Sequence, residues 1–203
     1  MRRLIVCLSA LLAMGSACAA DLLAGVQARL EQPALLRGQF EQQKNVVGFK
    51  RPLVSHGDFL LWREHGVLWH TAQPFDSTLA LRRDSLSVTQ ADGRGGYSMD
   101  AAREPGLRAV NGMLFALFSG DVASLQKQFR IEGELNGAQG WRLTLTPSSA
   151  ALAQVFQRIE LEGDRYVKRV RLDEASGDAS LIRFDRHATT PAATADEAAR
   201  LGN

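Results

Sequence analysis

Hydrophobic and polar positions follow a helical period only near the start of the chain and alternate along most of the rest. In residues 22–30, leucine and valine share one helical face, which predicts a short amphipathic helix that begins after Asp21 and ends before Pro33. From residue 36 the period falls to two, the period of a β-strand with one buried face. The sequence therefore predicts a mainly β protein with few helices.

The alternating segments predict about ten short strands, separated by turns that contain glycine, asparagine or proline. These segments are residues 36–42, 56–63, 67–71, 77–82, 85–89, 129–135, 141–146, 155–162, 166–172 and 181–186. One helical pattern interrupts them at residues 110–118, and a second short helix is predicted through Leu125.

This order of elements differs from the strand–helix alternation of a parallel sheet. It predicts a mainly β (α+β) fold, a large curved antiparallel sheet or unclosed antiparallel β-barrel covered by two or three short helices. Residues 22–30 and 110–118 offer the apolar helical surfaces that are available as a cover. We expect both helices in or over the mouth of a half-closed barrel.

Residues 1–20 have the pattern of a secretory signal peptide, with Arg2 and Arg3 before an apolar run and a stretch of small residues. Cleavage is expected before Ala20 or before Asp21. Residues 21–187 are then expected to form one soluble domain. Residues 188–203, rich in alanine and threonine, are predicted to be a flexible tail.

Cleavage at either position would remove Cys7 and Cys18, so the mature domain would contain no disulfide and no cysteine metal ligand. Lipidation of Cys18 is the alternative, which would anchor the protein to a membrane. The triplet that precedes Cys18 lacks the larger aliphatic residue that such signals usually carry.

The balance of charge gives no indication of a strongly basic or acidic protein. The chain has 24 Lys and Arg against 22 Asp and Glu, and the predicted signal peptide holds two of the arginines and no acid. The mature chain would therefore be neutral in formal charge, so nucleic acid is not an expected partner.

Few residues have the spacing that catalysis or metal binding requires, and we expect no catalytic residue, metal or cofactor. The histidines His56, His65, His70 and His187 show no zinc-site spacing, so they are interpreted as surface or strand-edge residues. Ser124 and Lys127 have the spacing of some acylating hydrolases, which leaves an envelope hydrolase as a minor alternative. The partner motifs of those enzymes are missing from the sequence.

A block of sequence resembles the periplasmic lipoprotein carriers of the LolA type. Residues 57–75 read GDFLLWREHGVLWHTAQPF, similar to that family's Gly-Asp, Trp-containing strand, turn arginine and proline turn. GQFEQQK at residues 38–44 and WRLTLTPSS at residues 141–149 are similar to two further family segments, in the same order. The resemblance implies an unclosed antiparallel β-barrel around a hydrophobic cavity for acyl chains.

The resemblance also implies partners and one specific role. The expected partners are lipoprotein or lipid acyl chains, an inner-membrane releasing transporter and an outer-membrane receptor, and the carrier is expected to be a periplasmic monomer. Arg63 is similar to the family arginine that binds backbone carbonyls of the covering helices in the closed state, the lid latch. Glu64, where the family usually has proline, and Val67, where it usually has an aromatic residue, leave open which cargo is carried.

The alternating apolar residues can be interpreted either as a packed core or as the lining of a lipid cavity. The family resemblance favours the cavity. The residues expected to bind lipid are Phe40, Phe59, Leu61, Val67, Trp69, Leu79, Leu81, Met113, Leu114, Leu117 and Phe118. A carrier that passes acyl chains toward the outer membrane is the function expected first. A membrane-anchored receptor of the LolB type or a lipid-sensing regulatory domain is the alternative.

Overall fold

The computed structural model describes residues 14–83, 85–90, 96–100, 112, 115–116 and 122–202. Its strands form a single sheet in which every neighbouring pair is antiparallel. The strands are β1 (Leu35–Asn45), β2 (Leu53–Trp62), β3 (Gly66–Gln73), β4 (Ser77–Leu81), β5 (Ser85–Gln90), β6 (Tyr97–Asp100), β7 (Phe129–Asn136), β8 (Gly140–Pro147), β9 (Phe156–Gly163), β10 (Val167–Glu174) and β11 (Ala179–Ala188).

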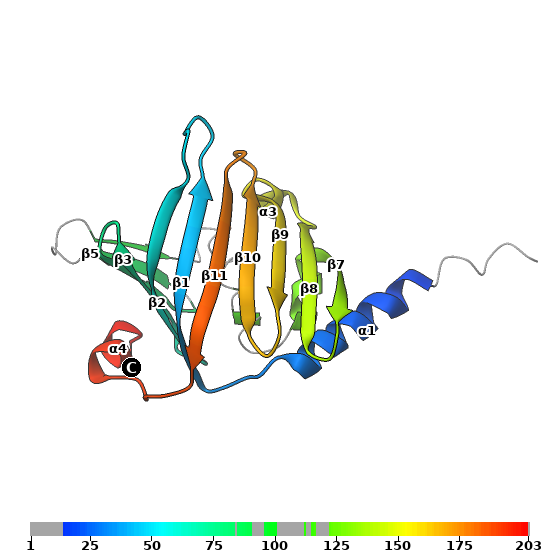
Figure 1. The fold of residues 1–203 in the computed structure, drawn as a ribbon, viewed down its shortest axis with the longest axis horizontal. Coiled ribbons are helices and arrows are strands. Elements are labelled where there is room, and N and C mark those ends of the chain that lie inside the picture. Colours follow the sequence, from blue (N-terminus) through cyan, green and yellow to red (C-terminus); the bar gives the residue numbers. More distant parts are fainter. Residues whose placement is uncertain are drawn as a thin grey trace, which may run out of the picture.

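The sheet consists of two meanders joined by the first and last strands. Its order is β6-β5-β4-β3-β2-β1-β11-β10-β9-β8-β7, so β1 pairs with β2 on one side and with β11 on the other (Figure 1). β6 and β7 stand at the two edges, and the sheet is not closed. The predicted fold class, an unclosed antiparallel sheet of mainly β structure, is therefore confirmed.

The helix α1 (Met14–Arg29) covers the β7–β9 end of the inner face, the face on which the main apolar core lies. Leu23 and Val26 of α1, with Leu30 directly after its end, share a buried cluster with Trp141, Leu143, Leu145, Ile159 and Leu161. Arg29 at its end donates hydrogen bonds to the carbonyls of the β7–β8 turn, including that of Gly137 at 2.9 Å. α1 starts before the predicted position, but its buried residues are those of the predicted apolar face.

The predicted helix at residues 110–118 falls mostly outside the described residues. Gly112, Phe115 and Ala116 are described in a helical conformation, and Ala116 is buried in the same core as α1. The second predicted helix is present as the 3₁₀ helix η1 (Val122–Lys127). A further short helix, α3 (Ala150–Ala153), was not predicted; the hydroxyl of Ser149 accepts a hydrogen bond from the backbone N–H of Leu152 at its start. No described helix is long and apolar enough to span a membrane.

The end of the chain differs from the flexible tail that its composition predicts. The helix α4 (Ala195–Arg200) begins with a capping box, in which Thr194 and Glu197 exchange side-chain-to-backbone hydrogen bonds. Leu201, directly after the helix, is buried on the outer face of the sheet. The apolar residues beneath it are Leu60, Leu68 and Ala80. A composition of small and polar residues predicts disorder. The capping box and the burial of Leu201 provide contacts that composition alone does not reveal.

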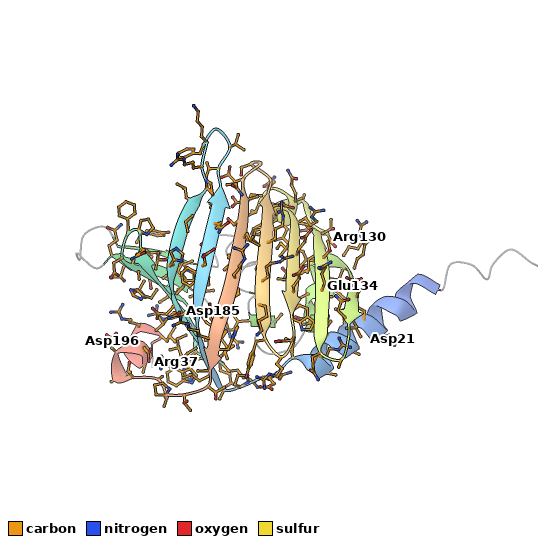
Figure 2. All side chains as sticks on the ribbon, viewed as in Figure 1. Asp21, Arg37, Arg130, Glu134, Asp185 and Asp196 are labelled. Carbon is orange, nitrogen blue, oxygen red and sulfur yellow. The ribbon has the colours of Figure 1, made fainter. Side chains whose placement is uncertain are left out.

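Arg37 of β1 fixes α4 to the sheet. Its guanidinium donates to both carboxylate oxygens of Glu197, at 2.6 and 2.8 Å, and to the carbonyls of Pro191 and Ala192 at 3.0 and 2.9 Å. In Figure 2, Arg37 lies beside the helix that carries Asp196. Bidentate, charge-assisted pairs of this kind are the strong ones among surface ion pairs.

The Arg37–Glu197 pair predicts a loss of stability in acid. The hydrogen bond from Arg37 holds the pKa of Glu197 at about 2, below its usual 4.5. The carboxylate therefore stabilises the folded state above pH 4.5, and this contribution is lost as the pH falls from 4.5 to about 2. Glu197→Gln should be less stable at neutral pH and lose less stability across this window, as measured by urea unfolding at several pH values. Glu132→Gln, in an exposed strand position, is the control. If the free energy of unfolding of Glu197→Gln depends on pH as steeply as that of the wild type, the assignment is wrong.

Candidate functional site

A cavity of about 300 Å³ lies on the inner face of the sheet, beside the core that α1 covers. Its walls come from both meanders and from the segment that links α1 to β1. The lining residues are Leu30, Glu31, Pro33, Leu36, Gln42, Phe59, Leu61, Val67, Trp69, Leu79, Leu81, Leu86, Phe156, Tyr166, Val167, Val170, Leu172, Ile182, Phe184 and His187. Hydrocarbon and aromatic groups dominate this lining, so the cavity suits an apolar ligand.

Strand register places the first half of this lining on one face. Residues directly opposite each other in an antiparallel sheet have side chains on the same side. The pairing of β2, β3 and β4 therefore aligns two apolar rows, one of Phe59, Trp69 and Leu79, the other of Leu61, Val67 and Leu81. The residues between them along each strand point to the outer face, where α4 packs.

Aromatic rings organise the middle of the cavity wall. Trp69 stacks on Phe40, with ring centroids 3.8 Å apart, and Phe59 meets the edge of Phe184 at 5.4 Å. The ring of Phe59 lies over Gly38, where an added Cβ atom would come within 2.5 Å of a ring carbon. Glycine at position 38 therefore allows Phe59 to cross from β2 toward β11.

The second half of the lining comes from β9, β10 and β11 and was not predicted as site residues. Val170 and Leu172 of β10, and Ile182 and Phe184 of β11, face the cavity. Their alternating spacing marks them as inward-facing, and cross-strand register joins Phe184 to Phe40. Because β1 pairs with β11, residues separated by most of the chain meet at one site, and alternation within each strand does not specify that pairing.

A small polar cluster interrupts the apolar lining near the α1–β1 link. Glu31 accepts a hydrogen bond from the hydroxyl of Tyr166 at 2.6 Å and one from Arg165 at 3.3 Å. The hydrogen bond to Glu31 raises the pKa of Tyr166. The His187 ring stacks on that of Tyr166 at 5.1 Å, and burial, followed by the charge of Lys168, lowers the pKa of His187.

Arg63, predicted as the lid latch, donates hydrogen bonds to the backbone carbonyls of Gln32 and Pro33, the second at 3.3 Å. These acceptors lie in the segment between α1 and β1, whereas the family resemblance implied carbonyls of a covering helix. Its Nε is buried and has no hydrogen-bond partner among the described residues. Arg63 thus ties the α1–β1 link to the β2–β3 turn, and its role as a latch stays a prediction.

The other predicted residues are distributed as follows. Phe59, Leu61, Val67, Trp69, Leu79 and Leu81 line the cavity, while Phe40 contacts it through Trp69. Met113, Leu114, Leu117 and Phe118 lie outside the described residues. That these residues bind lipid stays a prediction.

Residues weighed for other chemistry lie away from the cavity, apart from His187. Ser124 and Lys127 belong to η1 and do not line it. His70 lies between two carboxylates on the outer face, with Nδ1 2.7 Å from Asp58 and Nε2 3.2 Å from Asp76. Within the described part of the chain, no three His, Cys, Asp or Glu side chains form a metal-binding group.

The fold and the site together define a mainly β protein with an open antiparallel sheet and an apolar cavity on one face. The sequence model of the family described as outer membrane lipoprotein carrier protein LolA-like matches residues 14–201. The chain belongs to this LolA-like family, as its sequence motifs suggested. None of the curated proteins compared with it matches.

Two solved structures share the fold at low sequence identity, and a third is similar over most of its length. A DUF1329 family protein from Desulfovibrio piger is 10% identical with a TM-score of 0.52, covering 88% of this chain and 94% of its own. An uncharacterized conserved protein from Thermus thermophilus is 10% identical with a TM-score of 0.50, over 92% and 93% of the two chains. A LolA superfamily protein from Nitrosomonas europaea is 10% identical with a TM-score of 0.48, over 89% and 96%.

Two histidines in different surroundings should have pKa values shifted in opposite directions. The hydrogen bond to Asp58 raises the pKa of His70 above its usual 6.5, whereas burial lowers that of His187 below it. Nuclear magnetic resonance titration of the imidazole signals should show His70 gaining its proton first as the pH falls. Asp58→Asn should lower the midpoint of His70 and leave that of His187 in place. If His187 gains its proton before His70 as the pH falls, the surroundings assigned to the two histidines are wrong.

Proposed function

We propose that the protein is a non-catalytic carrier that shields the acyl chains of a lipoprotein or another lipid in the inner-face cavity. One observation carries this proposal: the apolar lining remains around a cavity of about 300 Å³ although the same sheet packs a dense core beside it. A protein that needed only a stable core would gain from filling this space, because cavities reduce stability. Membership of the LolA-like family supports the same function.

The physical need for such a carrier follows from the hydrophobic effect. Each methylene brought into water costs about 0.8 kcal/mol, so a palmitoyl-sized chain costs on the order of 12 kcal/mol. A carrier must offset most of this cost and still release its cargo. Flat aromatic and branched aliphatic walls, held together by few specific polar contacts, suit a cargo that is long, flexible and apolar.

The proposed setting is the periplasm, where the signal-like residues 1–20 would direct the chain. A monomer would there receive its cargo from an inner-membrane transporter and deliver it to an outer-membrane receptor. The polar cluster of Glu31, Tyr166 and His187 stands at the α1–β1 link and would contact the polar part of the cargo.

A charge placed in the cavity should prevent lipid binding. Leu61→Glu buries a carboxylate against Val67 and Leu81, and the described residues that line the cavity include no Lys or Arg to pair with it. Lipid that co-purifies with the wild-type protein should be reduced at least about tenfold in the variant, as measured by mass spectrometry. Leu61→Met preserves an apolar side chain of similar size and should retain lipid.

Ala72→Glu places the same charge at an exposed position of β3 and serves as the control for charge alone. Circular dichroism establishes that each variant is folded. A folded Leu61→Glu protein that retains as much lipid as the wild type would exclude the cavity as the binding site.

Replacing Arg63, the proposed latch, should affect the uptake of lipid and its release differently. Arg63→Leu removes the hydrogen bonds to Gln32 and Pro33, each worth roughly 1.5 to 3 kcal/mol for a charged donor. The α1–β1 link should then move away from the cavity more readily, so lipid should be accepted as well or better. Onward transfer should become slower, because closure would no longer favour expulsion of the cargo.

A transfer assay between donor and acceptor membranes, run beside a retention assay, measures the two effects. Arg83→Leu, at an exposed position in the β4–β5 turn, is the control for loss of an arginine. If Arg63→Leu changes neither loading nor transfer, Arg63 has only a structural role.

A further inference from the structure

Large apolar side chains are exposed at one end of the sheet, the end at which β1 turns into β2. Antiparallel register places the start of β2 beside the end of β3, because His56 pairs with Gln73. Five of the eight large apolar residues left exposed in the described part of the chain lie at this end: Val47, Phe49, Leu53, Val54 and Phe75. Scattered apolar residues on a surface are ordinary, but a group at one projecting end indicates a binding surface.

The β1–β2 hairpin projects beyond the neighbouring turns of the sheet (Figure 1). It is held there by the β10–β11 turn. The backbone N–H of Val47 donates to Asp178 at 3.0 Å, and the ammonium of Lys44 lies 2.9 Å from Glu174. The hairpin tip, residues 45–54, is therefore fixed in position while Val47 and Phe49 remain 66% and 64% exposed.

The charge of the hairpin tip is entirely positive. Residues 45–54 contain Lys50 and Arg51 and no acid. Both cations are exposed, and neither forms an ion pair or hydrogen bond with the described residues. Lys44, at the base of the same hairpin, is by contrast paired with Glu174 and Asp178.

This combination matches the surface of a lipid bilayer better than it matches a second copy of this chain. Exposed aromatic and aliphatic groups enter the boundary between headgroups and acyl chains, and neighbouring Lys and Arg side chains are attracted to anionic headgroups. We propose that the hairpin tip docks on a membrane surface that contains anionic lipids. The site is separate from the cavity and does not depend on the proposed carrier function.

Vesicle sedimentation tests this assignment with the purified protein. The wild type should bind vesicles of phosphatidylglycerol and phosphatidylethanolamine more tightly than vesicles of phosphatidylcholine, and added salt should weaken the binding. Val47→Ser with Phe49→Ser should reduce binding at least about tenfold, because two side chains no longer enter the bilayer. Lys50→Ala with Arg51→Ala should reduce it about 30-fold on anionic vesicles only.

Matched variants control for the loss of apolar area and of charge. Leu135→Ser removes an exposed leucine at the opposite end of the sheet, close to the β7–β8 turn. Arg83→Ala with Arg186→Ala removes two exposed arginines away from the hairpin. Both should bind vesicles like the wild type, and the hairpin variants should still retain co-purified lipid to the wild-type level.

Three results would overturn the proposal. The first is a wild-type protein that sediments with none of the vesicles. The second is hairpin variants that bind as well as their matched controls. The third is a hairpin-dependent self-association, seen by analytical ultracentrifugation, that accounts for the sedimentation; the tip would then be an interface between copies of the chain.

Discussion

The inner face of the sheet presents apolar side chains along both meanders, and each of them must be kept from water by something that packs above it. α1 does this for the β7–β9 end, where Trp141, Leu143 and Ile159 become buried. Toward β2–β4, the rows that contain Leu61 and Trp69 surround a cavity instead. Uneven covering of one continuous apolar face thus gives the protein both a buried core and an apolar cavity.

The two faces of β2–β4 have different roles, since one lines the cavity and the other packs against the C-terminal segment. Strand alternation sends Leu60 and Leu68 outward while their neighbours point into the cavity. α4 covers the outward row and is fixed by the Arg37–Glu197 pair. Packing on the outer face therefore holds β2–β4 in place, so the side chains that line the cavity need not pack tightly against another element.

Much of the fold follows from periodicity, and the limits of that prediction have physical causes. Alternation of period two identified most strands and half of the cavity wall, since Phe59, Leu61 and Trp69 face one side in any register that keeps their parity. The pairing of β1 with β11 depends on contacts between distant segments, which local patterns do not encode. For the same reason Phe184 and His187 were not assigned to the site. Likewise, α4 depends on Leu201 meeting an outward row on strands far away in sequence.

The geometry around Arg63 bears on how readily the cavity could open. Two carbonyl acceptors receive hydrogen bonds from one end of its guanidinium, while the buried Nε has none among the described residues. A charge-assisted hydrogen bond contributes about 1.5 to 3 kcal/mol, but an unsatisfied buried donor costs about 1 to 3 kcal/mol. Two such hydrogen bonds set against one unsatisfied donor leave Arg63 a net contribution of about 0 to 5 kcal/mol to holding the α1–β1 link. A volume of about 300 Å³ stands at the lower end of ligand pockets, so the acyl chain proposed as cargo would have to displace part of the covering segment to enter. In the proposed carrier, breaking the hydrogen bonds to Gln32 and Pro33 would cost less than the roughly 12 kcal/mol that burial of a palmitoyl-sized chain returns.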